Sequence, residues 1–442
     1  MSTHRSISWP GIVRLGLVQT SLGAIVVMTT STLNRIMVVE LGLAAVIPGA
    51  LVALHYFIQI SRPRFGHGSD QGSRRTPWII GGMVVLALGG VLAAASTAVM
   101  AQSTMAGLAL AVVGFLMIGA GVGASGTCLL VLLAATVEPK RRAAAASITW
   151  IMMIAGFAVT AGLIGSFLDP FSFTRLVTIA AIVGIIAITV TVIALTGLET
   201  RYARPVEQVE NNESPTRFGD ALREVMAESH TRRFALFVFI SMLAYSAQDL
   251  VLEPFAGAVF GMTPGQSTQL GGTQHAGVLL GMLLVAFIGY RFSGMRNGVM
   301  RLCMLVGCLS SSVFLVLLAV SGYISADWPL HGMVLALGTA NGAFAVAAIG
   351  AMMGLVSRGH QQRDGVRMGV WGAAQAIAFG SGGIAGTLAV DIVRVLTQSP
   401  LHAYSLVFVL QAILFALAAL LAAEITQRPA ASPADGELKH VF

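Results

Sequence analysis

The sequence predicts an all-α membrane protein with twelve transmembrane helices, arranged as two related six-helix bundles. Hydrophobic residues make up 56% of the 442 residues and charged residues only 10%, whereas a soluble protein carries about a quarter charged residues. Apolar runs long enough to cross a bilayer follow one another along the chain, and similar residues recur at matching positions in its two halves. These observations exclude a soluble protein of this length.

One criterion was used to place the predicted spans. A helix needs roughly 20 predominantly apolar residues to cross the hydrocarbon core of a bilayer. The expected spans are residues 14–38, 46–61, 78–99, 105–134, 147–168, 175–196, 234–259, 275–290, 301–321, 330–356, 368–390 and 402–423.

These spans divide the chain into four parts. Residues 1–196 form an N-terminal six-helix bundle, residues 197–233 a cytoplasmic linker, residues 234–423 a C-terminal six-helix bundle, and residues 424–442 a cytoplasmic tail. The linker is rich in Glu, Asn and Arg. The tail combines Pro, Ala and charge without periodicity, a composition typical of disordered segments.

The orientation follows from the basic residues. With the N-terminus inside, 23 of the 26 Lys and Arg residues lie in cytoplasmic segments, and only Arg35, Arg175 and Arg394 remain for the other side. This positive-inside bias places both termini in the cytoplasm. It also explains the isoelectric point near 9.8, so the positive charge does not indicate nucleic-acid binding.

The two halves repeat each other at an offset of about 220 residues. The matches are Asn34 with Glu253, Gly42 with Gly261, Gly119 with Gly338, Gly123 with Gly342, Arg142 with Arg363, Trp150 with Trp371, Gly162 with Gly383 and Gly165 with Gly386. Six helices repeated in parallel are the architecture of the major facilitator superfamily. We therefore expect that fold.

The loop between the second and third spans, RPRFGHGSDQGSRRTPW, resembles the facilitator loop signature G-x-x-x-D-R-x-G-R-R. Gln71 replaces the first Arg of the signature, and Gly72 lies one place early. The resemblance implies that the Asp caps a neighbouring helix and pairs with an Arg. The alternative is an ordinary basic cytoplasmic loop. The signature residues are Gly66, Asp70, Arg74 and Arg75.

The seventh span carries two carboxylates. Asp249 and Glu253 are four residues apart and share one helix face, and Pro254 is expected to kink or end the helix. Carboxylates inside a span are costly and mark function, unless these two are simply hydrated or paired near the periplasmic end. Because Arg35 follows Asn34, the repeat counterpart of Glu253, we expect Arg35 and Glu253 to form a charge pair between the halves.

Other polar groups are few in the predicted spans. His55 is the only histidine expected well inside a span, ~14 Å from the start of its helix at 1.5 Å per residue. A neutral imidazole either ligates the magnesium of a chlorophyll or bonds to a neighbouring helix, and the sequence alone favours the second role. His275 is expected at exposed loop depth, so its spacing from His55 is treated as accidental. Asn341 and Asp249 are the other interior candidates.

The sequence contains no nucleotide-binding loop, dinucleotide fingerprint, zinc-ligand spacing or nucleophile elbow in a suitable context. We therefore expect neither an enzyme nor a metal site.

Three segments carry a more specific resemblance. They are LVQTSLGAIVVMTTSTLNRIMVVELGLAAVIPGALVALHY, RPRFGHGSDQGSRRTPWIIGG and AYSAQDLVLEPFAGAVFGM. Together with residues 8–423 as a whole, they resemble the PucC/LhaA family, the bacteriochlorophyll-delivery branch of the facilitator superfamily in phototrophic bacteria. The resemblance implies a light-harvesting assembly factor in the bacterial inner, intracytoplasmic photosynthetic membrane.

The implied partners are the α and β antenna polypeptides, with pigment-synthesis enzymes or protein-insertion machinery as further candidates. The implied cofactor is transiently held bacteriochlorophyll. Two alternatives stay open: a secondary transporter of a small solute, with Asp249 and Glu253 as its coupling groups, and a membrane scaffold that binds antenna helices without pigment.

Overall fold

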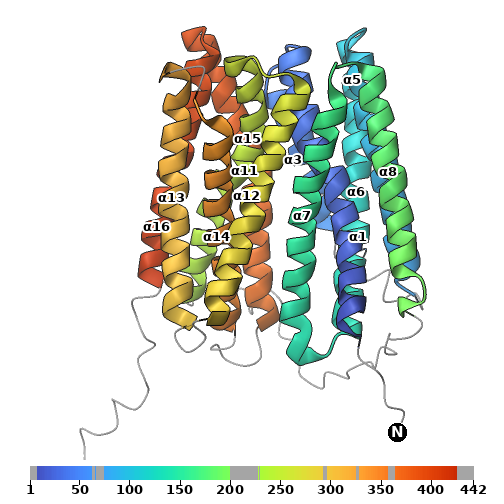
Figure 1. Cartoon of the computed structure of the whole chain (residues 1–442), viewed down its shortest axis with the longest axis vertical. Helices are drawn as coiled ribbons and strands as arrows, with labels where there is room; N and C mark the ends of the chain where they lie inside the picture. Colours follow the sequence, from blue (N-terminus) through green and yellow to red (C-terminus); the bar gives the residue numbers. More distant parts are fainter. Residues whose placement is uncertain are drawn as a thin grey trace, which may run out of the picture.

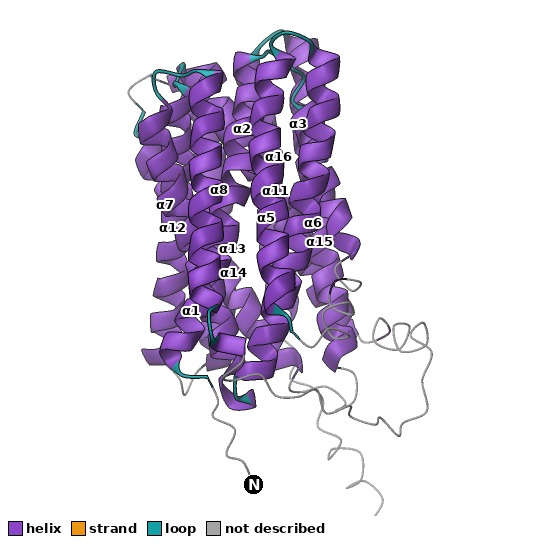
Figure 2. Cartoon of the chain, turned by 90° about the vertical axis from the view of Figure 1, so that its right-hand side faces the viewer, coloured by secondary structure: helices purple, strands orange, loops and turns teal. Residues whose placement is uncertain are grey.

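The computed structural model describes residues 7–61, 65, 74–199, 227, 229–291, 296–324, 328–356 and 364–425, and every regular element within them is helical (Figure 2). The helices are α1 (Trp9–Val27), α2 (Leu33–Arg35), α3 (Val46–Ile58), α5 (Thr76–Met100), α6 (Thr104–Thr136), α7 (Arg142–Leu168), α8 (Phe173–Leu195), α11 (Ser229–Phe260), α12 (Pro264–Arg291), α13 (Arg296–Ile324), α14 (Leu330–Val356), α15 (Asp364–Thr397) and α16 (Pro400–Ile425).

The helices form two side-by-side bundles (Figure 1). Helices α1 to α8 surround one hydrophobic core and α11 to α16 another, and α7 and α12 meet at the boundary. Within the described residues, eleven helices are long and apolar enough to cross a membrane, and α3 supplies a shorter twelfth. The predicted all-α architecture of two six-helix bundles is confirmed.

Both bundles share the same two ends. One end carries Ile7 and the start of α7, and we call it the N-terminal end (Figure 1). The other, which we call the opposite end, carries the short connections 41–45 and 261–263. Gly42 and Gly261 have φ angles of 64° and 67°, a left-handed conformation that glycine adopts without steric cost. These repeat partners therefore end the first helix of each half in the same way.

The first membrane span is not a regular α-helix. It continues from Trp9 to Glu40, but the segments Met28–Thr32 and Ile36–Glu40 wind as π-helix on either side of α2. Each π-turn accommodates an extra residue and rotates the side chains that follow it, and such bulges are frequent at functional sites. Here they surround Asn34 and Arg35.

One predicted helix boundary was far from the observed one. Helix α11 ends at Phe260, close to its predicted end, and Pro254 lies inside it without ending it. Helix α12 begins at Pro264 rather than at residue 275. The segment PGQSTQLGGTQH is too polar to be recognised as lipid-facing, but many of its residues are buried against other helices rather than exposed to lipid. Low hydropathy here reflects burial inside the protein.

The glycines of the repeat define its register. A Cβ atom on Gly119 would lie 2.6 Å from the carbonyl oxygen of His55, and one on Gly338 would lie 2.1 Å from that of Gln274. Both helix pairs therefore pack backbone against backbone, as small residues allow in membranes. The packing counterpart of His55 is Gln274, the residue before His275, so the offset of about 220 residues also holds for this part of the second half.

Candidate functional site

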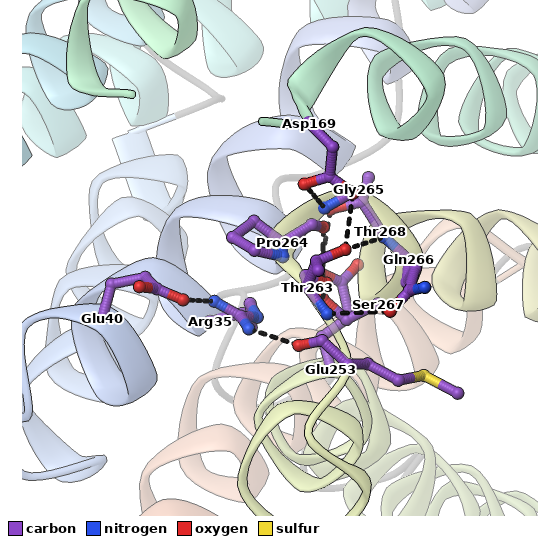
Figure 3. A network of polar contacts seen from close by, with 11 residues as sticks. Arg35, Glu40, Asp169, Glu253, Thr263, Pro264, Gly265, Gln266, Ser267 and Thr268 are labelled. Atoms are coloured by element: carbon purple, nitrogen blue, oxygen red, sulfur yellow. Dashed lines mark hydrogen bonds and ion pairs between the residues drawn. The ribbon is translucent and has the colours of Figure 1, made fainter. Parts of the chain in front are cut away.

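A set of buried polar groups joins the two halves near the opposite end. Figure 3 shows the end of the first span, with Arg35 and Glu40, beside the start of α12 and Asp169 at the end of α7. Because water is absent from the bilayer core, each buried polar group must find a partner within the protein. We call this set of contacts between the halves the clasp, and its members are Ser31, Thr32, Asn34, Arg35, Asp169, Glu253, Thr263, Thr268 and Asp391.

Asn34 explains why α11 continues through Pro254. Proline has no backbone N–H, so the carbonyl of residue i−4, Leu250, lacks its usual helical donor. The side-chain Nδ2 of Asn34 donates to that carbonyl oxygen at 2.7 Å. Asn34 belongs to the other half of the molecule and is 1% exposed. A defect in one bundle is thus satisfied by a side chain from the other.

We expect Asn34→Leu to destabilise the protein by about 1–3 kcal/mol, because it leaves the buried Leu250 carbonyl without a donor. Pro254→Ala restores the missing backbone N–H, so Asn34→Leu should cost much less in that background. Thermal unfolding in detergent of the two single variants and the double variant measures this coupling. Equal losses in both backgrounds would mean that the proline does not create the need for Asn34.

Glu253 accepts hydrogen bonds from hydroxyl groups of both halves. Ser31 Oγ donates to Glu253 Oε1 at 2.5 Å, and Thr268 Oγ1 lies 3.3 Å from Glu253 Oε2. Thr268 Oγ1 is also 3.3 Å from Thr32 Oγ1. With Glu253 only 1% exposed, these contacts supply the polar partners that a buried carboxylate requires.

The predicted ion pair between Arg35 and Glu253 was wrong. Arg35 Nη1 instead pairs with Glu40 Oε1 at 2.5 Å, and Nη2 donates to the backbone carbonyl of Met262 at 2.7 Å. The guanidinium packs over Gly257, where a Cβ would lie 3.0 Å from Nη2. Gly257 is one helical turn beyond Glu253, so the two side chains share a region without bonding. The π-turn at residues 36–40 leaves Glu40 within reach of Arg35.

Two aspartates cap helices across the boundary. Asp391 on α15 accepts from the backbone N–H groups of Ala45 and Val46, both at 2.8 Å, at the start of α3. Asp169, directly after α7, accepts from the Thr263 hydroxyl at 2.5 Å and the Gly265 N–H at 3.1 Å, at the start of α12.

Helix N-termini present unpaired N–H groups and a positive dipole end, which a carboxylate satisfies. In each case the capping residue and the capped helix belong to different halves. Neither aspartate was predicted from the sequence, although each lies shortly after a glycine of the repeat, Gly165 or Gly386.

The remaining interior candidates lie within the second half. Asn341 is fully buried; its Nδ2 donates to Gln248 Oε1 at 2.8 Å, and its Oδ1 accepts from Ser311 at 2.8 Å. Asp249 is half-buried, and its Oδ1 has no hydrogen-bond partner among the described residues. Asn341 therefore serves internal packing, whereas Asp249 keeps unused hydrogen-bonding capacity.

The loop signature is only partly described. Gly66 and Asp70 lie outside the described residues. Arg74 is exposed and Arg75 is 8% exposed. A carboxylate does cap the adjacent helix α5, but it comes from Glu199, whose oxygens accept from the backbone N–H groups of Arg75 and Thr76 at 2.5 and 2.8 Å.

Within the described part of the chain, two histidines rather than one are buried in membrane spans. His55 is 1% exposed inside the first half, and its Nδ1 lies 2.7 Å from the Val52 carbonyl oxygen. His275 is 5% exposed in α12 and lies edge-on to Phe157 of α7, with ring centroids 5.0 Å apart. The expectation that His275 lies at loop depth was wrong because α12 starts eleven residues earlier. A role for His55 as a pigment ligand stays a prediction.

The family follows from a direct comparison. A family model described as "PUCC protein" matches residues 32–430. The chain belongs to this family. The PUCC chain is 51% identical to "Bacteriochlorophyll synthase 44.5 kDa chain" of Rhodobacter capsulatus, over 94% of this chain and 95% of the relative. It is 25% identical to "Protein PucC" of Cereibacter sphaeroides, over 84% and 81%.

Solved structures confirm the fold of this PUCC protein. The nucleoside transporter NupG superposes with a TM-score of 0.67 at 14% identity, covering 95% of this chain and 100% of the transporter. An inward-facing bacterial homologue of the human lysosomal transporter Spinster gives 0.65 at 14% identity, covering 94% and 96%. Both are transporters of the major facilitator superfamily, so the predicted fold is confirmed.

Proposed function

We propose that this PUCC protein is a non-enzymatic assembly factor that delivers bacteriochlorophyll to the α and β antenna polypeptides of bacterial light-harvesting complexes. The observation that carries the proposal is family membership across residues 32–430, with relatives named for PucC and for bacteriochlorophyll synthesis. The proposed location is the inner, photosynthetic membrane, with the N-terminal end facing the cytoplasm. The proposed further partners are pigment-synthesis enzymes and protein-insertion machinery.

The structure supports a carrier or chaperone in one respect. Two bundles with separate hydrophobic cores are fastened together by the clasp at one end. We infer that each bundle moves as a unit about that end, because parting the boundary elsewhere leaves most of each hydrophobic core intact. A boundary of this kind suits a large apolar cargo that must be taken up and released within the membrane.

Deletion of the gene in its phototrophic host tests the proposal. We expect antenna absorption to fall severalfold while the pigment-synthesis enzymes stay present, and a plasmid copy of the wild-type gene to restore the antenna. Unchanged antenna spectra in the deletion strain would refute the proposal. Formation of bacteriochlorophyll from its precursors by the purified protein alone would show that it is an enzyme.

A secondary transporter is the second candidate, and Asp249 favours it. Its unpartnered Oδ1 lies one turn from Glu253 on α11, and intramembrane carboxylates are common coupling groups. Proteoliposomes distinguish the two functions. Uptake driven by a pH gradient that Asp249→Asn with Glu253→Gln abolishes, together with loss of antenna in cells carrying that variant at normal protein level, would establish transport.

A further inference from the structure

The boundary between α7 and α12 changes character along its length. Toward the opposite end it is closed by glycine: a Cβ on Gly165 would lie 2.6 Å from the Gly265 carbonyl oxygen, and one on Gly272 would lie 2.9 Å from the Gly162 nitrogen. Backbones this close leave no room for a ligand. Asp169 reinforces the closure by capping α12 at the same end. This part of the boundary forms a fixed edge.

Toward the N-terminal end, the same boundary is built from larger and more flexible side chains. Next to the glycines, Phe157 of α7 contacts His275 of α12. Beyond this contact, a small separate cluster of apolar residues from both halves packs together. Thioether side chains are flexible and polarizable, and they recur on surfaces that adapt to varied apolar partners. The cluster contains Ile154, Val278 and Met282 with Ile151, Met153, Phe157, Leu279 and Val346 around them.

His275 lies where the two parts of the boundary meet. It is about 17 Å from the start of α12 at 1.5 Å per residue, which is near the middle of a hydrocarbon core roughly 30 Å thick. Its Nδ1 is buried and has no hydrogen-bond partner among the described residues. An imidazole left in this state is costly unless something else satisfies it.

Two further side chains have polar atoms without a hydrogen-bond partner among the described residues. They are the buried Nε2 of Gln274, next to His275 in the chain, and the buried Oε1 of Gln19, whose Nε2 is 3.1 Å from the sulfur of Met153. Through Met153, Gln19 of α1 is linked to the same helix that carries Phe157. The imidazole of His275 and these two side-chain amides therefore provide unused hydrogen-bonding atoms in a region that also contains phenylalanine and methionine side chains.

We propose that the boundary between α7 and α12 is the pigment site, with His275 as the axial ligand of the magnesium in a bacteriochlorin ring. A magnesium bacteriochlorin takes one nitrogen ligand and apolar surroundings. His275 would supply the nitrogen, and the cluster around Ile154, Val278 and Met282 the apolar surfaces on either side of the boundary. The assignment rests on the proposed function. It places the cargo between the two bundles rather than within one of them.

His55 lacks these properties. Its ring lies inside the first half, its Nδ1 contacts the Val52 carbonyl, and its backbone packs against Gly119 without space for a Cβ. Access to it requires opening the core of a bundle. Access to His275 requires that the part of the α7–α12 boundary around Ile154, Val278 and Met282 separates, while the glycine edge stays closed.

The experiment titrates the purified full-length protein with bacteriochlorophyll in detergent micelles. His275→Leu should weaken binding about tenfold, which corresponds to ~1.4 kcal/mol, and the visible band that reports magnesium coordination should move toward its unligated position. His275→Gly with added imidazole should regain binding and the ligated spectrum. His402→Leu, at an exposed position on α16, should behave like wild type. Because His275→Leu itself can impair folding, the imidazole rescue is the decisive comparison.

Three results would overturn the assignment. His275→Leu with wild-type affinity and spectrum excludes the ligand role, and loss of the ligated spectrum in His55→Leu alone moves the ligand to His55. Wild-type protein that binds no pigment, in a host whose deletion strain still loses its antenna, overturns the pigment site but leaves a pigment-free assembly role. Absence of both effects overturns the proposed function as well.

Discussion

Glu40→Ala should cost about 3–5 kcal/mol of unfolding free energy, because it leaves the guanidinium of Arg35 buried without its counter-ion. Arg35 is 2% exposed, whereas Glu40 is 32% exposed. The reverse substitution, Arg35→Leu, leaves a carboxylate that water can still reach. It should therefore cost less, about 1–3 kcal/mol for the lost hydrogen bonds and packing.

The double variant Arg35→Leu with Glu40→Ala should recover much of the loss seen in Glu40→Ala alone, since no buried charge remains. Thermal unfolding in detergent gives all three values. Arg394→Leu, an exposed arginine at the same end, serves as the control and should change little.

Glu253 is another carboxylate near Arg35, so it tests whether Glu40 is the counter-ion of Arg35. If Glu40→Ala is nearly neutral and becomes costly only with Glu253→Gln, then Glu253 serves as the counter-ion of Arg35.

Hydropathy and charge were sufficient to predict the two helical bundles, because residues that face lipid must be apolar. They failed at α12, where Ser267, Thr268 and Gln274 are polar but buried, and where the helix is nonetheless long and apolar enough to span the membrane. Hydropathy measures what faces lipid. It does not identify a helix whose polar residues face another helix.

The repeat located the clasp but not its bonds. Aligning Asn34 with Glu253 placed Arg35 in the correct region, near the boundary of the halves. The two π-turns then changed which side chains Arg35 faces, and helical periodicity cannot predict such a change because it assumes 3.6 residues per turn. The partner of Asn34 was also hidden, because it is a backbone carbonyl freed by Pro254.

Removing the two capping aspartates should open the clasp. Asp169→Ala and Asp391→Ala each remove the cap of a helix in the other half, and each should cost about 0.5–2 kcal/mol. The caps share no partner, so the losses should add. Both caps join one half to the other. The double variant should therefore lose stability and, in addition, expose residues that lie between the halves.

Cysteine labelling measures that exposure. Thr32→Cys, in a background without Cys128, Cys303 and Cys308, places a thiol at a position that is 1% exposed. Its maleimide labelling should be slow with both caps present and about tenfold faster without them, as a shift of ~1.4 kcal/mol toward the open form implies.

Ser172→Ala is the matched control for this last prediction. Ser172 caps α8 through the Arg175 N–H at 3.1 Å, but both residues belong to the same half. Its loss should reduce stability by a similar amount without accelerating labelling of residue 32. Equal acceleration in Ser172→Ala would mean that labelling reports general loosening of the fold. Acceleration confined to the aspartate variants assigns it to the boundary, because only those caps join one half to the other.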